Sequence, residues 1–548
     1  MHCEARRMQK SGSAGSPRPA VFFDRDGVIN RDVGYLHRPE DFEFTPGAAQ
    51  AIAACNAAGY LVFIVTNQGG VGLGLYDAQA VETLHAHMRA QLAAHGAHID
   101  DIRYCVHHPN AVTAERRVPC DWRKPGPGMI RDLMQAWPVD PRASFLVGDR
   151  ETDMAAAREA GIGGHLYVGG DLHQFVRRHL RDSNAARLRH WLAETALVRW
   201  RGEGPLFAER LMPDGRADAT APYRVMAQMR QVYVYAHAAV LGLTGDAGPA
   251  QRAFDETLKR AALPDGGFAY SLTPQGGILD ATRDSYTHAF ILLAASWLHR
   301  AGGRDMRPVM ESVAQAIESL RCADGEGYRE SDRPGAVRRQ NPHMHLFEAF
   351  LAAYEAAGDS RYLARAEEIL ALFHTRFFDA GQGVLREYFA PDLSALPGPQ
   401  GDLVEGGHHY EWVWLLGEHA RLTGTPLADE ARALHRFAAA HTHEAATHLI
   451  YRENDADGVV RNGGKRAWAL AEAIKAEITL AEHDPAFLPA ADRHLRVLFE
   501  HFLDRPLEGL WLDTLDPENR PAVDYSAASN FYHVFLGFAE YIRFAGKA

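Results

Sequence analysis

The sequence has few cysteines, no long apolar run and no excess of basic residues, and each shortage excludes a class of protein. Five cysteines in 548 residues do not make a disulfide framework, so we expect a reducing, cytoplasmic compartment. No apolar run reaches the roughly 18 residues that cross a bilayer, so we expect no transmembrane helix. The formal net charge of −12 argues against a nucleic-acid partner.

The remaining composition is that of an ordinary folded chain. Apolar residues make up 47% and charged residues 23%, which excludes a wholly disordered chain and a collagen-like fibre. At roughly 150 residues per domain, the length indicates several domains. Residues 1–18 include basic residues but no apolar core, so we expect a flexible leader there and not a secretory signal peptide.

Residues 19–175 alternate short apolar runs with segments of helical period. The candidate strands are Ala20–Asp24, Leu61–Thr66, Ile102–Val106, Ser144–Val147 and His165–Val168. Unbroken apolar strands that alternate with helices predict an α/β domain whose parallel sheet is covered on both faces. In such sheets the chemistry lies at the carboxyl ends of the strands. The polar, basic stretch 176–184 is expected to be a linker or a connecting helix.

The pattern changes over residues 185–548, which hold twelve segments of helical period. A short stretch with an aromatic or aliphatic anchor follows every odd-numbered segment, and the anchors are Phe207, Phe268, Tyr328, Leu385, Tyr451 and Trp511. Their spacing of about 60 residues is typical of arrays of helical hairpins. Six hairpins fit an all-α (α/α)6 barrel, in which alternate helices form an inner ring, and an open solenoid is the alternative.

Acidic side chains gather at two predicted strand ends of the first region. Asp24 and Asp26 follow the first strand, where carboxylates at i and i+2 project to the same side and can share a metal and a substrate. Asp149 and Asp153 follow the fourth strand and add carboxylates for a hard cation such as Mg²⁺.

Groups that suit a phosphoryl group lie close to the same strand ends. Thr66 and Asn67 end the second strand, where a hydroxyl and backbone N–H groups can hold phosphate oxygens. Arg123 and Lys124 offer two cations suited to a transferring phosphoryl group, in a loop able to reach these ends.

This ordered set resembles the haloacid dehalogenase-like phosphatases, above all the heptose bisphosphate and histidinol-phosphatase branch. The matching stretches are RDGVINRDVGYLHRPEDFEFTPG, VTNQGGVGLG, CDWRKPGPGM and VGDRETDM, within residues 18–175. The resemblance implies a Rossmann-like domain without a large cap.

The same resemblance implies a reaction through a phosphoaspartate on Asp24. Asp26 would protonate the leaving oxygen and later activate water. Thr66 and Lys124 would stabilise the phosphoryl group, and Arg123 would help to recognise the sugar phosphate. Mg²⁺ would be held by Asp24, the carbonyl oxygen of Asp26 and Asp149, with Asp153 supporting this set.

The family also carries a zinc loop, from which this sequence departs at one ligand. The family pattern is Cys-x-His followed by Cys-x-Cys, and the corresponding residues here are Cys105, His107 and Cys120, with Trp122 in the fourth position. Indole does not coordinate a metal, and structural zinc normally has four ligands. Two alternatives are open: zinc with His108 or Asp121 as the fourth ligand, and a zinc-free loop packed around Trp122.

The polar candidates of the second region fall on even-numbered helical segments, most of them near the N-terminal end. They are Arg230, Tyr286, His288, Asn341, His345, His408, Glu411, Arg466, Glu472 and His533. In a closed ring these helix ends converge on one mouth, where the helix dipoles favour electron-rich oxygens. An open solenoid would spread the same residues along a long surface, so the pattern favours the closed barrel.

The second region resembles the N-acylglucosamine 2-epimerase superfamily, which also holds mannose isomerases and some mannose-6-phosphate isomerases. The stretches that match, within residues 190–545, are QMRQVYVYA, DSYTHAF, NPHMHLFEAF, EGGHHYEWVWLL, RAWALAEAIKAE and AASNFYH. The resemblance implies that His408 and His533 are the acid–base pair at sugar carbons C1 and C2. The other eight candidates would bind the substrate. Ala469 and Leu470 stand where the family more usually has Pro-Gln. This departure affects what the resemblance implies about the choice of sugar more than what it implies about activity.

Together these patterns predict a bifunctional sugar-phosphate enzyme. Residues 19–175 would hydrolyse a phosphomonoester with Mg²⁺, and residues 185–548 would isomerise or 2-epimerise a mannose-type sugar without a metal. The alternative is a single-activity phosphatase, for histidinol phosphate or another small ester, with a barrel that binds sugar or dimerises without turnover. We expect small sugar phosphates as ligands and no nucleic-acid or membrane partner, and we leave a homodimer open.

Overall fold

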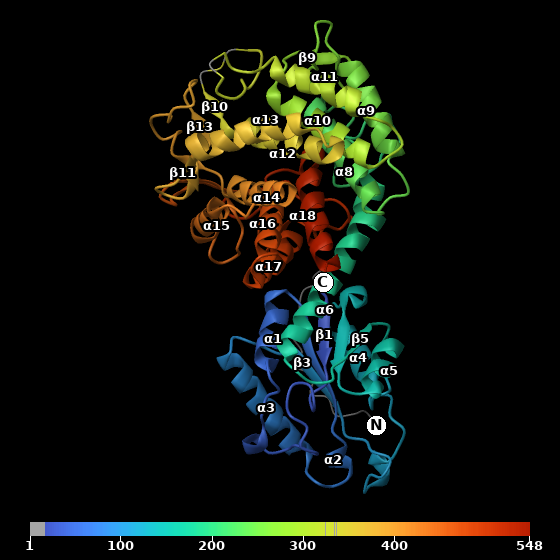
Figure 1. Ribbon diagram of the computed structural model, residues 1–548. Helices are drawn as coiled ribbons and strands as arrows, with labels where there is room; N and C mark the ends of the chain where they lie inside the picture. The colour runs from blue at the N-terminus through green and yellow to red at the C-terminus, as the bar shows by residue number, and fades with distance from the viewer. Residues whose placement is uncertain (1–16, 324, 334, 336, 548) are drawn as a thin grey trace. The chain divides into compact units, whose positions relative to one another are not determined.

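The computed structural model describes residues 17–323, 325–333, 335 and 337–547, and the chain divides into two compact units, residues 1–188 and 189–548 (Figure 1). Residues 1–16 of the predicted leader lie outside the described residues. Arg18 belongs to the first unit, because its guanidinium donates to the carbonyl oxygen of Gly59 at 2.7 Å. No helix in the described ranges is both long and apolar enough to cross a bilayer.

The first unit is built on a five-stranded parallel sheet with the strand order β3-β2-β1-β4-β5. The strands are β1 (Ala20–Phe23), β2 (Leu61–Asn67), β3 (Asp101–Cys105), β4 (Phe145–Gly148) and β5 (Gly163–Leu166). The helices are α1 (Ala48–Ala57), α2 (Gly69–Gly72), α3 (Ala78–Ala94), α4 (Gly128–Ala136), α5 (Glu151–Ala160) and α6 (Leu172–His190). The predicted α/β fold is confirmed.

Helices cover both faces of this sheet, which explains why its strands read as unbroken apolar runs. Phe23 of β1 packs into the cluster that contains residues of α1, α3 and α6. Phe22 points to the opposite face and packs with residues of α4 and α5. Residues 176–184, where we predicted a linker or a connecting helix, lie within α6, and Val176 and Leu180 belong to the first of these clusters.

The second unit is a closed ring of inner helices surrounded by outer helices. The inner helices are α8 (Val225–Val240), α10 (Ser285–Arg300), α12 (Gln340–Ala357), α14 (Gly406–Thr423), α16 (Ala467–Ala481) and α18 (Ala528–Gly546). The outer helices are α7 (Leu197–Trp200), which follows a π-helical turn, α9 (Gly248–Ala261), α11 (Arg307–Glu318), α13 (Ser360–Leu372), α15 (Asp429–His441) and α17 (Leu488–Leu498). Each inner helix packs against the next, and α18 packs against α8. The ring therefore closes, which confirms the barrel and rules out an open solenoid.

Short strands that sequence periodicity does not reveal join the helices. One sheet has the order β14 (Leu403–Val404), β15 (Tyr451–Asp455), β16 (Val460–Arg466) and β17 (Thr514–Leu515). The others pair β18 (Ser526–Ala527) with β6 (Arg210–Leu211), β10 (Arg338–Arg339) with β13 (Tyr388–Phe389), β11 (Phe378–Asp379) with β12 (Val384–Leu385), and β7 (Tyr223–Arg224) with β8 (Ser271–Leu272) and β9 (Ile278–Asp280).

The six inner helices present their chemistry in one layer. The sixth residues of these helices, in chain order, are Arg230, Phe290, His345, Glu411, Glu472 and His533. All six are buried. Because one residue per helix contributes, five polar side chains and one aromatic ring meet at the same depth of the barrel.

Two candidate active sites

The first site is a group of three carboxylates at the carboxyl ends of β1 and β4. The ligand oxygens of Asp24, Asp149 and Asp153 all lie within 4.8 Å of one another. Asp24 is held beside β4 because its N–H donates to the carbonyl oxygen of Val147 at 2.9 Å. Asp153 is fixed in the first turn of α5, where it accepts the N–H of Arg150 at 3.0 Å. The parallel sheet therefore assembles this acidic group from two strand ends.

Lys124 is the cation of this group. Its Nζ lies 2.9 Å from Asp24 Oδ2 and 2.5 Å from Asp153 Oδ1. Burial raises the pKa of Asp24 to about 6, although Lys124 opposes the rise. Burial disfavours the Lys124 ammonium, but Asp24 and Asp153 outweigh it and raise the Lys124 pKa. Arg150 adds a second cation, with its Nε 3.8 Å from Asp149 Oδ1, so three carboxylates face two cations and the site carries an excess of negative charge.

Asp26 lies in a hydrogen-bond network that the sequence analysis did not identify. It accepts from the guanidinium of Arg25 at 2.8 Å, the amide of Asn30 at 3.0 Å and the amide of Gln68 at 2.9 Å. The Gln68 amide also donates to Thr66 Oγ1 at 3.0 Å. Gln68 therefore links the predicted acid–base residue to the predicted phosphate-binding hydroxyl.

Asn67 and Arg123, both predicted to bind substrate, make side-chain hydrogen bonds with the backbone. Asn67 donates to the carbonyl oxygen of Lys124 at 3.1 Å and accepts its N–H at 3.0 Å. Arg123 donates to the carbonyl oxygen of His107 at 2.9 Å. Both polar atoms of the Asn67 amide are used in this way, so Asn67 holds the loop that presents Lys124.

The carboxylate group fits a hard divalent cation such as Mg²⁺, which favours oxygen ligands. Asp149 Oδ1 is buried and makes no hydrogen bond within the described residues. Gly27 leaves room for this carboxylate, because a Cβ at that position would lie 2.3 Å from Asp149 Oδ2. The φ angle of Gly27, +86°, also favours glycine.

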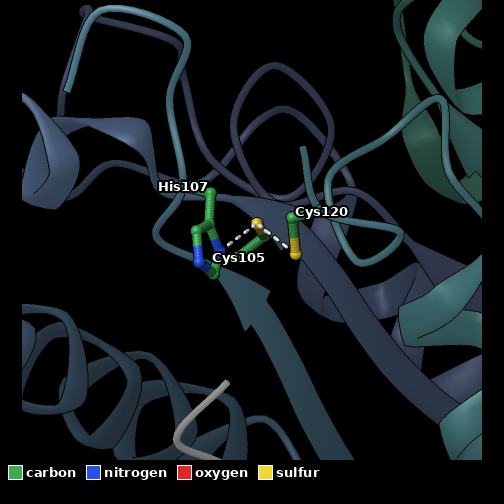
Figure 2. Close-up of side chains that lie close together, drawn as sticks. All are labelled: Cys105, His107 and Cys120. Carbon is green, nitrogen blue, oxygen red and sulfur yellow. Dashed lines mark hydrogen bonds between the residues drawn. The ribbon is translucent and has the colours of Figure 1, made fainter. Parts of the chain in front are cut away.

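Cys105, His107 and Cys120 lie together in the predicted zinc loop (Figure 2). Cys105 Sγ lies 3.7 Å from His107 Nδ1 and 3.9 Å from Cys120 Sγ. In the part of the chain that the structure describes, no fourth ligand joins them, so neither His108 nor Asp121 completes the set. This donor set of two thiols and an imidazole is soft and suits zinc.

The second site contains a histidine whose ring is held by a carboxylate. His533 Nδ1 lies 2.6 Å from Glu472 Oε1. Burial lowers the pKa of His533 well below its usual value, and the cations Arg230 and Lys475 lower it further. A neutral His533 donates from Nδ1 to Glu472, which leaves Nε2 with a lone pair.

His408 has the opposite electrostatic environment. Its Nδ1 lies 3.0 Å from Glu387 Oε2. Burial disfavours the charged ring, but Glu387 and Glu405 outweigh it and raise the pKa of His408 to about 10. His408 Nε2 lies 3.1 Å from the amide of Asn341, whose Oδ1 makes no other hydrogen bond within the described residues. An amide turned to present Oδ1 would accept from the imidazolium.

Trp468 lies against both histidines. Its ring centroid is 5.2 Å from that of His408 and 5.4 Å from that of His533. Arg466, two residues earlier, has its guanidinium 6.0 Å from the same indole and 3.8 Å from Asp513 Oδ2. The structure thus brings the protonated His408, the neutral His533 and the partly exposed Arg466 around one aromatic ring.

Carboxylate and phenol groups line the other side of the layer. Arg230 donates to Tyr286 Oη at 2.7 Å. His345 Nδ1 lies 3.0 Å from Glu348 Oε2, and its Nε2 lies 3.9 Å from Glu411 Oε1. Both carboxylate oxygens of Glu411 are buried without a hydrogen bond from the described residues. Such acceptors suit the hydroxyl groups of a sugar.

His288, predicted to bind substrate, does not belong to this site. Its Nε2 accepts the N–H of Phe268 at 3.2 Å, and its Nδ1 lies 2.7 Å from the carbonyl oxygen of Asp284. His343 and His409 repeat this pattern, with the backbone N–H groups of Tyr328 and Leu385. These three histidines tie the inner helices to the connectors that carry the repeat anchors, and we call them the latch histidines.

We expect the barrel to lose stability as the pH falls below about 6.5, the ordinary pKa of histidine. Burial lowers the pKa of His288, that of His343 to about 3 and that of His409 to about 4, so the unfolded chain binds protons at a higher pH than the folded chain. This contribution to stability is complete above pH 6.5 and decreases towards pH 3–4. Urea unfolding followed at several pH values between 5 and 7.5 measures it.

A His343→Gln variant distinguishes the contribution of the latch histidines to the pH dependence of stability from that of other titrating groups. Gln228 already makes the equivalent contact in α8, where it accepts the N–H of Phe207 at 2.9 Å and donates to its carbonyl oxygen. We expect the variant to fold. Its free energy of unfolding should change less steeply with pH than that of the wild-type chain, by up to about 1.4 kcal/mol per pH unit in this window. An unchanged slope would contradict the assignment.

Known proteins resemble each of the two units. Residues 207–537 match the N-acylglucosamine 2-epimerase (GlcNAc 2-epimerase) family model, and residues 121–186 match the HAD-hydrolase-like model. Over 175 residues, covering 32% of this chain and 97% of the relative, the chain is 47% identical to a D-glycero-beta-D-manno-heptose-1,7-bisphosphate 7-phosphatase of Rhodopseudomonas palustris. Over 375 residues, covering 65% of this chain and 96% of the relative, it is 33% identical to a mannose-6-phosphate isomerase of Rhizobium meliloti.

A solved structure supports the fold of the second unit. Cellobiose 2-epimerase from Spirochaeta thermophila superposes with a TM-score of 0.60 and 22% identity, over 67% of this chain and 98% of that protein. With the family models and relatives, both resemblances inferred from the motifs are confirmed. The chain is therefore a fusion in which a phosphatase unit of the haloacid dehalogenase-like heptose bisphosphate family precedes a sugar isomerase or epimerase unit of the N-acylglucosamine 2-epimerase family.

Proposed function

We propose that the first unit hydrolyses a phosphomonoester of a heptose bisphosphate-like sugar through a phosphoaspartate. The observation that carries this proposal is the position of Asp24, with its carboxylate beside Lys124 and the other two acids. An Asp24 oxygen attacks phosphorus, and the bond to the sugar oxygen breaks as Asp26 donates a proton to that oxygen. Asp26 then takes a proton from water, whose oxygen attacks phosphorus and releases phosphate from Asp24.

The remaining residues of the first site orient the phosphoryl group. Thr66 and Lys124 donate to its oxygens, and Arg123 contributes a further cation. Asp24, the carbonyl oxygen of Asp26 and Asp149 would hold Mg²⁺, with Asp153 beside them. The cation, when bound, offsets the repulsion between the carboxylates and the phosphate.

We propose that the second unit moves a proton between C1 and C2 of a mannose-type sugar. The opposite environments of His533 and His408 support this assignment. His533 takes the proton from C2 through Nε2 while His408 donates a proton to the carbonyl oxygen, which gives an enediol. His408 then takes the proton from the C2 hydroxyl as His533 returns its proton to C1, which yields the ketose. Return to the opposite face of C2 would yield the epimer.

A substrate panel tests both proposals on the full chain. We expect phosphate release from heptose bisphosphate to exceed that from histidinol phosphate, and ketose to form from mannose or mannose 6-phosphate. A barrel that binds sugar or dimerises without turnover would form no ketose or epimer from any aldose. Preference for histidinol phosphate would favour the single-activity alternative.

A further inference from the structure

A fully buried lysine lies one helical turn below the catalytic layer of the barrel. Lys475 is the ninth residue of α16, and the ninth residues of the other inner helices are Tyr233, Leu293, Glu348, Trp414 and Leu536. Its side chain is 0% exposed. Burial of an ammonium group costs several kcal/mol unless partners compensate it, so its partners define its role.

Lys475 is linked to the proposed base through one carboxylate. Its Nζ lies 2.6 Å from Glu472 Oε2, and the other oxygen of Glu472 lies 2.6 Å from His533 Nδ1. The ammonium also lies 3.9 Å from the centre of the Trp414 ring. Lysine, glutamate and histidine therefore form a continuous chain of contacts from the barrel interior to the site.

The interior around this chain contains more carboxylates than one cation can neutralise. The titratable and charged groups that face it are Glu411 from α14, Glu348 and His345 from α12, Tyr532, His533 and Glu540 from α18, and Arg230 from α8, with Arg466 at the start of α16. Glu477 lies on the other side of α16, where it contacts His435 and His494. Burial and Glu411 raise the pKa of Glu472, and Lys475 opposes that rise.

We propose that Lys475 is a positioning residue of the isomerase site: it keeps Glu472 charged, so that Glu472 accepts the Nδ1 proton of His533 and leaves Nε2 as the base. This inference rests on the proposed isomerase function. Without the cation, a neutral Glu472 would donate to Nδ1 and place the histidine proton on Nε2. The base would then have the wrong tautomer.

A Lys475→Met variant tests the inference, because it keeps the length of the side chain and removes the charge. At pH 7 we expect kcat for ketose formation to fall roughly 100-fold, the size of a general-base contribution, with little change in KM. We expect the acidic limb of the kcat–pH profile to move up by at least about one pH unit, because Glu472 now ionises only at higher pH. Activity should therefore recover partly as the pH rises.

Lys475→Arg supplies the matched control, because it keeps the charge and changes the shape. We expect its acidic limb to stay at the wild-type position, even where repacking lowers kcat. Thermal unfolding of both variants shows how much of any loss of activity comes from a loss of folded protein. A Lys475→Met variant with the wild-type profile, or with an equal loss of activity at every pH, would overturn the inference.

Nitrogen NMR of labelled histidine provides a readout that does not depend on turnover. We expect the His533 signals, assigned with His533→Asn, to report a proton on Nδ1 in the wild-type chain and on Nε2 in Lys475→Met. An unchanged tautomer would overturn the inference. A wild-type chain that turns over no aldose would instead contradict the proposed function, and the tautomer would still decide the role of Lys475.

Discussion

An Asp24→Asn variant is expected to release phosphate at least about 10⁴-fold more slowly than the wild-type chain, because the amide cannot act as the nucleophile. Asparagine has nearly the same shape, so the loop around Lys124 should persist. Isomerisation should continue at the wild-type rate, because the second unit holds its own site. Phosphate release and ketose formation, measured in parallel on the same preparation, check both halves of this prediction.

An Asp182→Asn variant is the matched control for this experiment. Asp182 belongs to the same unit, lies in α6 and has an exposed side chain. We expect it to leave both activities unchanged. Loss of ketose formation in Asp24→Asn, or phosphate release near the wild-type rate, would contradict the two-site proposal.

Replacement of His533 by asparagine should have the reverse effect. We expect ketose formation to fall by roughly 10²- to 10⁴-fold, the usual contribution of a general base, while phosphate release persists. Asparagine can still donate to Glu472, so the fold around α16 should be kept. Coupled assays of ketose and of phosphate provide the measurement.

His483→Asn is the control for the histidine experiment, since His483 is exposed and lies just beyond α16. It should leave both reactions unchanged. A barrel that retains full isomerase activity without His533 would refute its assignment as the base. A simultaneous loss of phosphate release would refute the independence of the two sites.

The elements and most of the site could be predicted because their signals are local. The apolar runs of β1, β2 and β4 mark strands buried on both faces, and the acids follow directly in the sequence. The inner helices are recognisable because polar residues recur near their N-terminal ends at about 60-residue intervals. The family resemblance adds that Asp24 and Asp149 share a cation, and the repeat places His408 in the same ring as His533.

The errors and omissions come from contacts between distant segments. The sequence pattern predicts His288 in the site because a latch histidine and a site histidine look alike in sequence, as His343 and His345 show. Glu387 lies on a connector after β12, where no periodicity indicates that it faces His408. Lys475 lies within an apolar run, and only the packed barrel shows which carboxylates surround it.

The inner helices share a common register, and this register determines which substitutions can change the reaction. Each helix supplies one side chain to the catalytic layer, while the latch histidines and the connectors hold the framework independently of that side chain. Phe290 fills the position of α10 with an aromatic ring, although the other five positions are polar. Single exchanges in this layer, or at His408 one turn nearer the start of α14, would therefore alter the reaction without rebuilding the scaffold that carries these residues.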